Sequence, residues 1–155
     1  MMLKSHLMFG LLIGLFGVQF LHPIQPFLFV LIVTATSTLP DIDTTRSFIG
    51  RKLPFYATIL NFFFGHRGIL HTVYPAVFLF ILAGVLGYPL VGFAILVGYA
   101  AHLILDALTL DGIKIFKPFH DLHIMGIIRT GGMFELVIFY FFFALVSYKI
   151  YYLLF

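Results

Sequence analysis

The residues of this chain that are best suited to chemistry are histidines and aspartates beside long apolar runs. His102 and Asp106 are four residues apart, which places both side chains on one face of a helix. An imidazole and a carboxylate on one face suit a bound metal ion or a proton relay. They suit equally well a hydrogen-bonded pair that joins two helices. The motif alone leaves these possibilities open.

A second pair of carboxylates lies in the segment Leu39-Pro-Asp-Ile-Asp. If this segment is extended, Asp41 and Asp43 point to the same side, because side chains alternate along a strand. Two such carboxylates repel each other unless a cation lies between them. The alternative is a turn that caps a helix, with Asp43, Thr44 or Thr45 at the N-cap. For this segment alone the capping turn is the simpler interpretation.

A third group comprises His66, Arg67 and His71. A spacing of five residues separates His66 and His71 by about 140° on a straight helix. We therefore expect His66 in a loop and His71 in the first helical turn, so that their rings can converge. Arg67 offers a planar, permanently charged fork that suits phosphate or carboxylate. The alternative is a basic interfacial loop, and His6 near the start of the chain indicates little by itself.

Membrane helices are the elements that must position these residues. The chain has 155 residues, of which 62% are hydrophobic and 10% charged, whereas a soluble domain carries about 25% charged residues. We therefore expect an all-α, polytopic helical bundle that forms a single membrane-embedded domain over residues 1–155. The chain has no cysteine, which excludes disulfides and thiolate metal sites.

Proline-containing or polar breaks divide the chain into apolar segments. These cover residues 3–21, 27–39, 54–64, 72–86, 90–110 and 133–155. They predict about four or five transmembrane helices, the first of which is a retained helix and not a cleaved signal. The 54–64 segment is too short to cross a hydrocarbon core of ~30 Å, so we expect a re-entrant or interfacial helix there.

The basic residues indicate the orientation of the bundle. The N-terminus and the segments 40–53, 65–71 and 111–132 carry eight of the nine lysines and arginines. Short hairpin connections place all four of these segments on one side of the membrane. The positive-inside rule makes that side cytoplasmic, in a multi-pass protein of the cell (inner) membrane.

In this topology the candidate residues fall near the same, cytoplasmic membrane face. They are His6, Asp41, Asp43, His66, His71, His102 and Asp106. A set of histidines and aspartates without cysteine is typical of a catalytic zinc, manganese or iron site, often with more than one ion. We therefore favour one shared polar site over independently scattered residues.

The order and spacing of these motifs resemble those of a known family. Its motifs correspond to His6, to Leu-Pro-Asp41-Ile-Asp43, to His66-Arg67-Gly-x-x-His71-Thr, and to His102-x-x-x-Asp106 followed by Thr109 and Gly112. This is the YdjM-type family of bacterial and archaeal inner-membrane proteins, which are regarded as metal-dependent hydrolases. The resemblance covers about residues 1–120. More distantly, the family is similar to zinc-dependent phospholipase C and P1-type nucleases.

The resemblance implies roles for individual residues. The seven histidines and aspartates above become ligands of one to three divalent ions, expected to be zinc, with manganese or iron as alternatives. Asp43 and Asp106 become carboxylates that hold or accept a proton, and Arg67 becomes the contact for a substrate anion. Glu135 is a further candidate carboxylate. His120 and His123 match no motif of the family and are expected at the interface.

The predicted function is therefore a metal-dependent hydrolase acting on a lipid or phosphoester substrate at the membrane interface. A divalent cation would lower the pKa of a coordinated water to about 7. One alternative is a transporter of protons or divalent metals, which would carry its ionisable groups at the membrane midplane. Another is a non-catalytic membrane scaffold. Membrane lipid is the expected partner. No nucleic-acid binding is expected, and the oligomeric state is not indicated.

Overall fold

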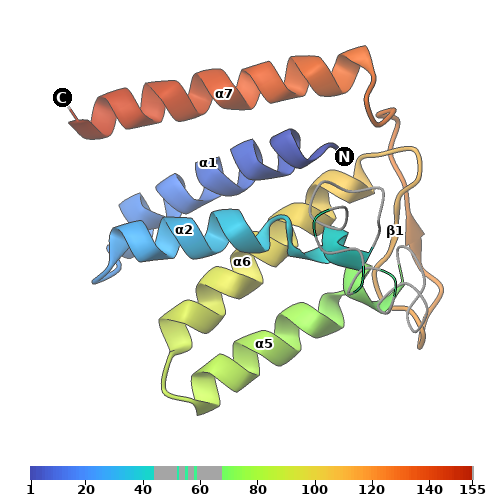
Figure 1. Cartoon of the computed structure of the whole chain (residues 1–155), viewed down its shortest axis with the longest axis horizontal. Coiled ribbons are helices and arrows are strands. Elements are labelled where there is room, and N and C mark those ends of the chain that lie inside the picture. Colours follow the sequence, from blue (N-terminus) through green and yellow to red (C-terminus); the bar gives the residue numbers. More distant parts are fainter. Residues whose placement is uncertain (44–51, 53–54, 56–57, 59–67, 155) are drawn as a thin grey trace.

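The chain folds into a bundle of helices with a small strand pair at one end, as the computed structural model shows (Figure 1). The structure describes residues 1–43, 52, 55, 58 and 68–154. Its elements are α1 (Leu3–Leu21), α2 (Pro26–Thr36), η1 (Leu39–Asp43), η2 (Ile69–His71), α5 (Val73–Val85), α6 (Pro89–Ala107), β1 (Ile113–Lys114), β2 (His123–Ile124) and α7 (Met133–Leu154). The expectation of an all-α membrane bundle is confirmed.

The number of full-length spans is lower than expected. Within the described ranges, three helices are long and apolar enough to cross a membrane, namely α1, α6 and Met133–Leu153 of α7. Helices α2 and α5 are apolar but have only 11 and 13 residues. At 1.5 Å per residue they reach about 16–20 Å, roughly half to two thirds of a hydrocarbon core. Apart from residues 55 and 58, the segment 54–64, where a further helix is expected, lies outside the described residues.

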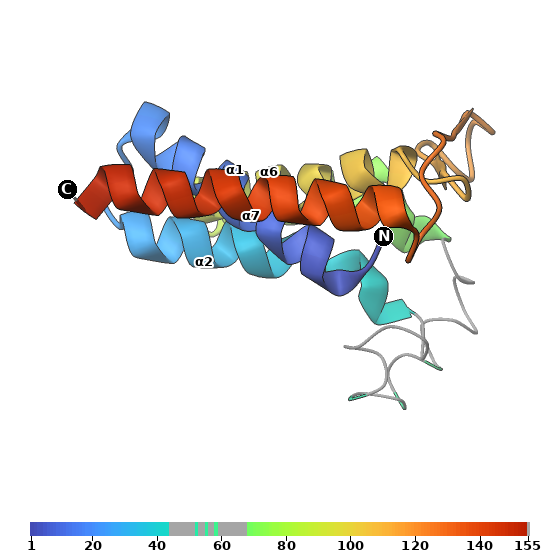
Figure 2. The same cartoon turned by 90° about the horizontal axis from the view of Figure 1, so that it is seen from above.

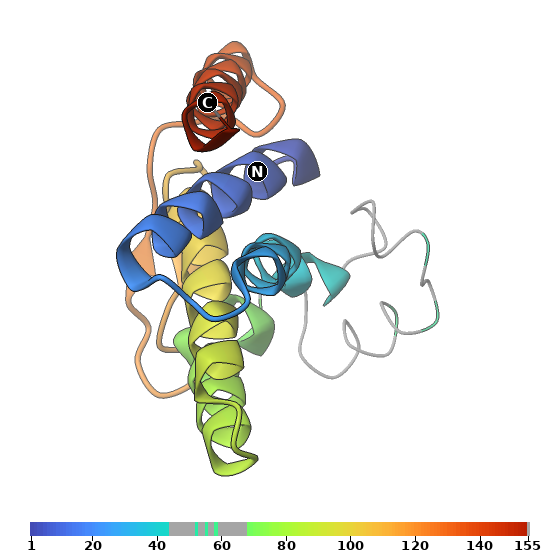
Figure 3. The same cartoon turned by 90° about the vertical axis from the view of Figure 1, so that its left-hand side faces the viewer.

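The helices run broadly along the long axis of the molecule, so that their ends gather at two opposite ends. The N-terminus, η1, η2, the end of α6 and the strand pair lie at one end, and the C-terminus lies at the other (Figures 1 and 2). Helix α7 lies at the edge of the bundle and packs on α1, away from α5 (Figure 3). The end that holds the N-terminus is called the site end below.

The two tight turns at the far end follow from local sequence. His22 and Gly87 adopt positive φ angles of 44° and 84°, which reverse the chain after α1 and α5. Pro26 and Pro89 then stand in the first turns of α2 and α6. Proline is pre-organised for this position because its fixed φ is helical and its missing N–H would have no helical partner.

Small residues let α1, α2 and α6 approach closely. A Cβ atom added to Gly10 would lie 2.3 Å from Ser37 Oγ, and one added to Gly14 would lie 3.1 Å from the backbone of Val30. A Cβ atom added to Gly98 would lie 2.3 Å from the carbonyl oxygen of Val33. Close backbone contact through small residues is the usual packing mode of membrane helices, where lipid removes the hydrophobic drive between them. These contacts set the relative height of the residues at the site end.

The segment after α6 forms an ordered hairpin. Strands β1 and β2 pair antiparallel, with Ile113 opposite Ile124. The Leu110 N–H donates to the carbonyl of Ile128 at 3.0 Å, and the Gly126 N–H donates to that of Thr109 at 2.9 Å. The segment from Leu108 to Arg129 is called the hairpin below. These bonds tie its second half to the residues that directly follow α6.

Candidate metal centre

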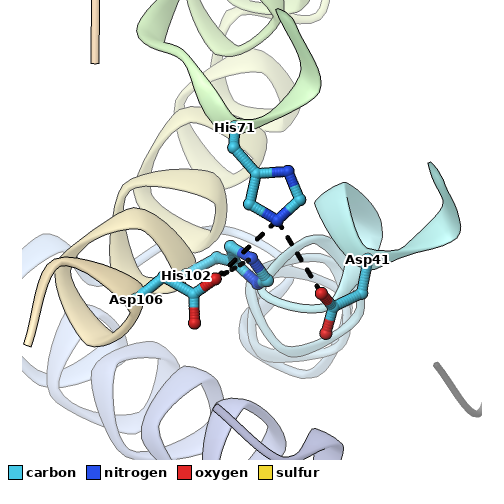
Figure 4. A group of neighbouring side chains, drawn as sticks. All are labelled: Asp41, His71, His102 and Asp106. Atoms are coloured by element: carbon cyan, nitrogen blue, oxygen red, sulfur yellow. Dashed lines mark ion pairs between the residues drawn. The ribbon is translucent and has the colours of Figure 1, made fainter. Parts of the chain in front are cut away.

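Four candidate residues from three elements converge at the site end (Figure 4). Asp41 comes from η1, His71 from η2, and His102 and Asp106 from the last turns of α6. One donor atom of each lies within 4.8 Å of the corresponding atoms of the others. His71, His102 and Asp106 are buried, and Asp41 is partly buried. These four residues are called the cluster below.

The distances between the donor atoms are close to those of a shared coordination sphere. His71 Nε2 lies 3.8 Å from Asp41 Oδ1 and 3.7 Å from Asp106 Oδ2. His102 Nε2 lies 3.6 Å from the same Oδ2 atom. Four ligands at about 2.0–2.2 Å from a tetrahedral zinc are about 3.3–3.6 Å from each other. The donors are also too far apart for direct hydrogen bonds.

The ring of His102 is held in one orientation by the backbone of α2's C-cap residue. His102 Nδ1 lies 2.9 Å from the carbonyl oxygen of Ser37, and because a carbonyl only accepts, Nδ1 carries the proton. The lone pair of the neutral ring is therefore on Nε2, which faces the carboxylates. This Nε2 is buried and has no hydrogen-bond partner in the described part of the chain. Metal-binding histidines typically have this arrangement, with the outer nitrogen bonded to a carbonyl or carboxylate.

Ser37 also joins α1 to this arrangement. Its hydroxyl donates to the carbonyl of His6 at 3.0 Å, and its side chain is fully buried against Gly10. Residues of α1, α2 and α6 are thus connected through one serine. Sequence reasoning missed Ser37. Its place in a short polar stretch at the end of an apolar segment marked the position, but nothing in the sequence indicated that its carbonyl would contact His102.

His6 lies beside the cluster, stacked on one of its members. Its ring is 4.0 Å from that of His102 and nearly parallel to it. Its Nε2 atom lies 3.3 Å from Asp106 Oδ1, and the Met1 amino group lies 2.5 Å from the same oxygen. Neither ring nitrogen of His6 makes a well-oriented hydrogen bond to a described residue. The Asp106 carboxylate therefore presents Oδ2 to the cluster and Oδ1 to His6.

His71 is positioned by the short η2 helix. The hydroxyl of Tyr99, on α6, donates to the carbonyl of Leu70, the residue before His71. The Thr72 hydroxyl donates to the carbonyl of Ile69 at 2.6 Å and closes the same turn. Tyr99 and Thr72 are both buried. The expected place of His71, in a first helical turn, corresponds to this short 3₁₀ turn ahead of α5.

Asp41 is charged at neutral pH. Burial opposes ionisation of its carboxyl, but attraction to His71, with smaller contributions from His102 and His6, outweighs burial. The pKa of Asp41 therefore lies below its ordinary value. The carboxylate is thus available as an anionic ligand.

The side chains of three remaining candidates fall where the structure gives no description, and Glu135 has a structural role. The side chain of Asp43 and the residues His66 and Arg67 lie outside the described residues. Glu135 is fully buried and accepts hydrogen bonds from Met2 N at 2.5 Å, Ser5 Oγ at 2.8 Å and Gly131 N at 2.7 Å. It holds the start of α1 against the start of α7.

The two unassigned histidines lie on the exposed hairpin. His120 is exposed, and the ring of His123 donates through Nε2 to the carbonyl of Asp111 at 3.0 Å. His123 is exposed as well. Both histidines therefore differ from the buried histidines of the cluster.

The cluster fits a divalent cation. Two carboxylates balance its charge, and two imidazoles supply nitrogen ligands of the kind that zinc, manganese and iron accept. His102 Nε2 is buried without a hydrogen-bond partner among the described residues, and such an atom costs free energy unless something binds it. A cation at the cluster would satisfy it. Proton sharing with Asp106 would satisfy it less completely, because His102 Nε2 lies 3.6 Å from Asp106 Oδ2.

Comparison with known proteins places this chain in a family. The family model of the YdjM inner membrane protein matches residues 1–154. The uncharacterized protein YvsG of Bacillus subtilis is 31% identical over 116 residues, which are 74% of this chain and 72% of YvsG. The inner membrane proteins YdjM of Escherichia coli and Shigella flexneri are each 33% identical over 90 residues, which are 54% of this chain and 45% of theirs. No solved structure matches.

Proposed function

Because the chain belongs to the family of YdjM inner membrane proteins and buries two histidines and two aspartates around one point, we propose that it is a membrane-embedded, metal-dependent hydrolase. We propose that it acts on a lipid or phosphoester substrate. The observation that carries this proposal is the environment of the His102 Nε2 atom. This atom is buried, oriented by the Ser37 carbonyl and directed at two carboxylates.

The residues at the site have two roles, holding the cation and orienting the residues that hold it. A bound divalent cation would supply Lewis-acid polarisation and would acidify a coordinated water. His71, His102, Asp41 and Asp106 would hold this cation. His6 orients the Asp106 carboxylate from the other side. Its Nε2 atom lies 3.3 Å from Oδ1 and can hold a proton there. Arg67 keeps its proposed role as the contact for a substrate anion.

The position of the cluster favours a substrate from the bilayer. It lies where α6 ends, next to η1 and η2, and so at the membrane surface on which the span terminates. A lipid in the same leaflet can present an ester or phosphoester group at this depth. We place this surface on the cytoplasmic side, since the segments rich in lysine and arginine share it.

The test is to measure bound metal and hydrolysis with matched histidine variants. The protein, purified in detergent, is analysed by elemental mass spectrometry and assayed with phospholipid, lysophospholipid and nitrophenyl phosphoester substrates. We expect about one or more equivalents of zinc, manganese or iron in the unchanged protein. His102→Ala should lose both metal and hydrolysis. The exposed His120→Ala, a control of the same chemistry on the hairpin, should keep both.

Two results would overturn the proposal. One is metal content that is equal in His102→Ala and in the unchanged protein, which would separate the cluster from metal binding. The other is a metal-loaded protein that hydrolyses none of these substrates but moves protons or divalent ions across reconstituted vesicles. That result would identify a transporter.

A further inference from the structure

The hairpin carries an exposed surface whose chemistry differs from that of the rest of the bundle. Large apolar side chains protrude from it, with Phe119 and Ile127 exposed by 85% and 88%. The hairpin also carries three cationic residues, Lys114, Lys117 and Arg129, of which the last two are exposed. Exposed apolar area of this kind marks an interaction site, and its mixture with cations selects the type of partner. The hairpin surface is defined here as these five residues.

The charges of this surface are only partly balanced within the described structure. Lys114 Nζ lies 2.7 Å from Asp121 Oδ1, and this pairing with Lys114 lowers the pKa of Asp121. Lys117 and Arg129 are exposed and form no ion pair with a described carboxylate. Two cations are therefore left for an external anion.

The surface is held firmly to the ends of two helices. The Val73 N–H, at the start of α5, donates to the carbonyl of Ile115 at 3.1 Å. The Tyr74 hydroxyl donates to the carbonyl of Phe116 at 3.1 Å, and its ring packs edge-on against Phe119 at 5.6 Å. Together with the bonds to the end of α6, these contacts fix the height of the hairpin relative to the bundle.

That height is the level of the lipid headgroups. Helix α6 ends at Ala107 and α7 begins at Met133, and both are long enough to span the membrane, so the hairpin between them lies at the surface where they end. At this level aromatic side chains lie beside acyl chains and cations meet phosphates. A soluble protein partner would explain the two exposed cations. It would not explain why large apolar side chains such as Phe119 and Ile127 are exposed at this level.

We propose that the hairpin surface binds anionic phospholipid headgroups of the leaflet in which the bundle ends. Lys117 and Arg129 contact the phosphates, and Phe119 and Ile127 lie among the upper acyl chains. The interaction holds the site end at a set depth and enriches anionic lipid beside it. It stands independently of the proposed hydrolase, because none of these residues is in the cluster.

The test uses the absence of tryptophan from the chain. Phe119→Trp provides a single fluorophore on the hairpin, and Leu31→Trp provides a control on α2, where the side chain is 52% exposed on an apolar helix. Each variant is reconstituted into phosphatidylcholine vesicles that contain the same fraction of brominated phosphatidylglycerol or brominated phosphatidylcholine. Tryptophan quenching then reports which lipid is adjacent. Helical circular dichroism confirms folding of every variant.

We expect Phe119→Trp to be quenched more strongly by the brominated anionic lipid, with an apparent preference of about fivefold per cation at low salt. The preference should fall when Lys117→Gln and Arg129→Gln are added and when salt shortens the Debye length. Leu31→Trp should show little preference. Emission typical of water, without quenching, would overturn the proposal. So would equal quenching by both lipids at low salt.

Discussion

The two oxygens of the Asp106 carboxylate face different groups, and this division is the basis of the site at the scale of single residues. Oδ2 faces His71 and His102, while Oδ1 faces His6 and the Met1 amino group. A carboxylate that is oriented from one side and faces imidazoles on the other is typical of metal ligands with outer-sphere support. This geometry fits the proposed role of Asp106 as a metal ligand that is itself oriented.

Replacing this carboxylate by its neutral amide tests that role. Asp106→Asn keeps the shape but removes the charge and turns one oxygen into a donor. We expect metal affinity to fall by more than about tenfold, as it does even for lost outer-sphere partners. Metal titration of the purified, chelator-treated protein measures this. Asp121→Asn, an exposed aspartate of the hairpin, is the control and should bind as the unchanged protein does.

Acidification should release the metal through the histidines and not through Asp41. An imidazole nitrogen binds a cation only when it is unprotonated, and the ordinary pKa of histidine is about 6.5. The pKa of Asp41 lies below its ordinary value, so this carboxylate stays charged throughout that range. Because His71 and His102 are buried, their protonated forms are disfavoured further. We therefore expect constant metal content from about pH 8 to about pH 6 and loss only below that range. Loss of metal already at about pH 7 would contradict this, as elemental analysis after dialysis would show.

Glu135 should stabilise the fold and not bind metal. Its carboxylate accepts three hydrogen bonds in a buried position, two of them from Met2 and Ser5. Glu135→Gln would leave a buried donor facing these donors, so we expect a loss of about 1–3 kcal/mol in the free energy of unfolding. Ser5→Ala removes one donor and should cost about 1 kcal/mol. Thermal unfolding in detergent measures both losses. If Glu135→Gln lost metal as Asp106→Asn is expected to, and kept its stability, this assignment would be contradicted.

At the scale of elements, the close contact of α2 with α6 determines the position of His102. Gly98 lies one helical turn before His102 and touches the backbone of Val33. Ser37, whose carbonyl orients the His102 ring, follows Val33 by the same interval along α2's end. The packing of α2 on α6 and the orientation of the His102 ring are therefore coupled, through one helical turn of each helix.

A single methyl group at this contact tests the coupling. Gly98→Ala places a Cβ atom 2.1 Å from Thr36 Oγ1 and 2.3 Å from the Val33 carbonyl, so the helices must separate. We expect a loss of about 1–3 kcal/mol in stability together with weaker metal binding. Gly84→Ala on α5 meets no atom within 4 Å and should be neutral or slightly stabilising. Unfolding and metal titration of the pair measure the difference. Equal behaviour of the two variants would contradict the coupling.

At the scale of the whole molecule, the two ends of the bundle should face opposite sides of the membrane. Because the chain has no cysteine, His120→Cys on the hairpin and Ile24→Cys in the far turn give single labelling positions, both exposed. In intact cells we expect a membrane-impermeant maleimide to label Ile24→Cys and not His120→Cys. In inside-out vesicles we expect the reverse. The opposite pattern would place the site end outside, and labelling of both from one side would contradict the topology.

The apolar segments and their ends follow from the sequence because they depend on local composition. The first segment was expected over 3–21 and is α1 (Leu3–Leu21). Helices α2, α5 and α6 are each shorter than the segments expected at 27–39, 72–86 and 90–110. Helix α2 ends at Thr36, since Pro40 cannot continue a helix, and α5 begins only after the η2 turn. Apolar composition predicts where a chain avoids water, but not where its backbone stops being helical.

The residue types of the site also follow from the sequence, because histidines and aspartates are costly beside lipid and therefore conspicuous. The tertiary structure alone decides which of them share a point. Asp41, His71 and Asp106 meet because glycines bring α1, α2 and α6 into contact and thereby set the height of each element. The Ser37 carbonyl that orients His102 leaves no trace in the sequence, since every residue has a carbonyl and only packing brings this one to the ring.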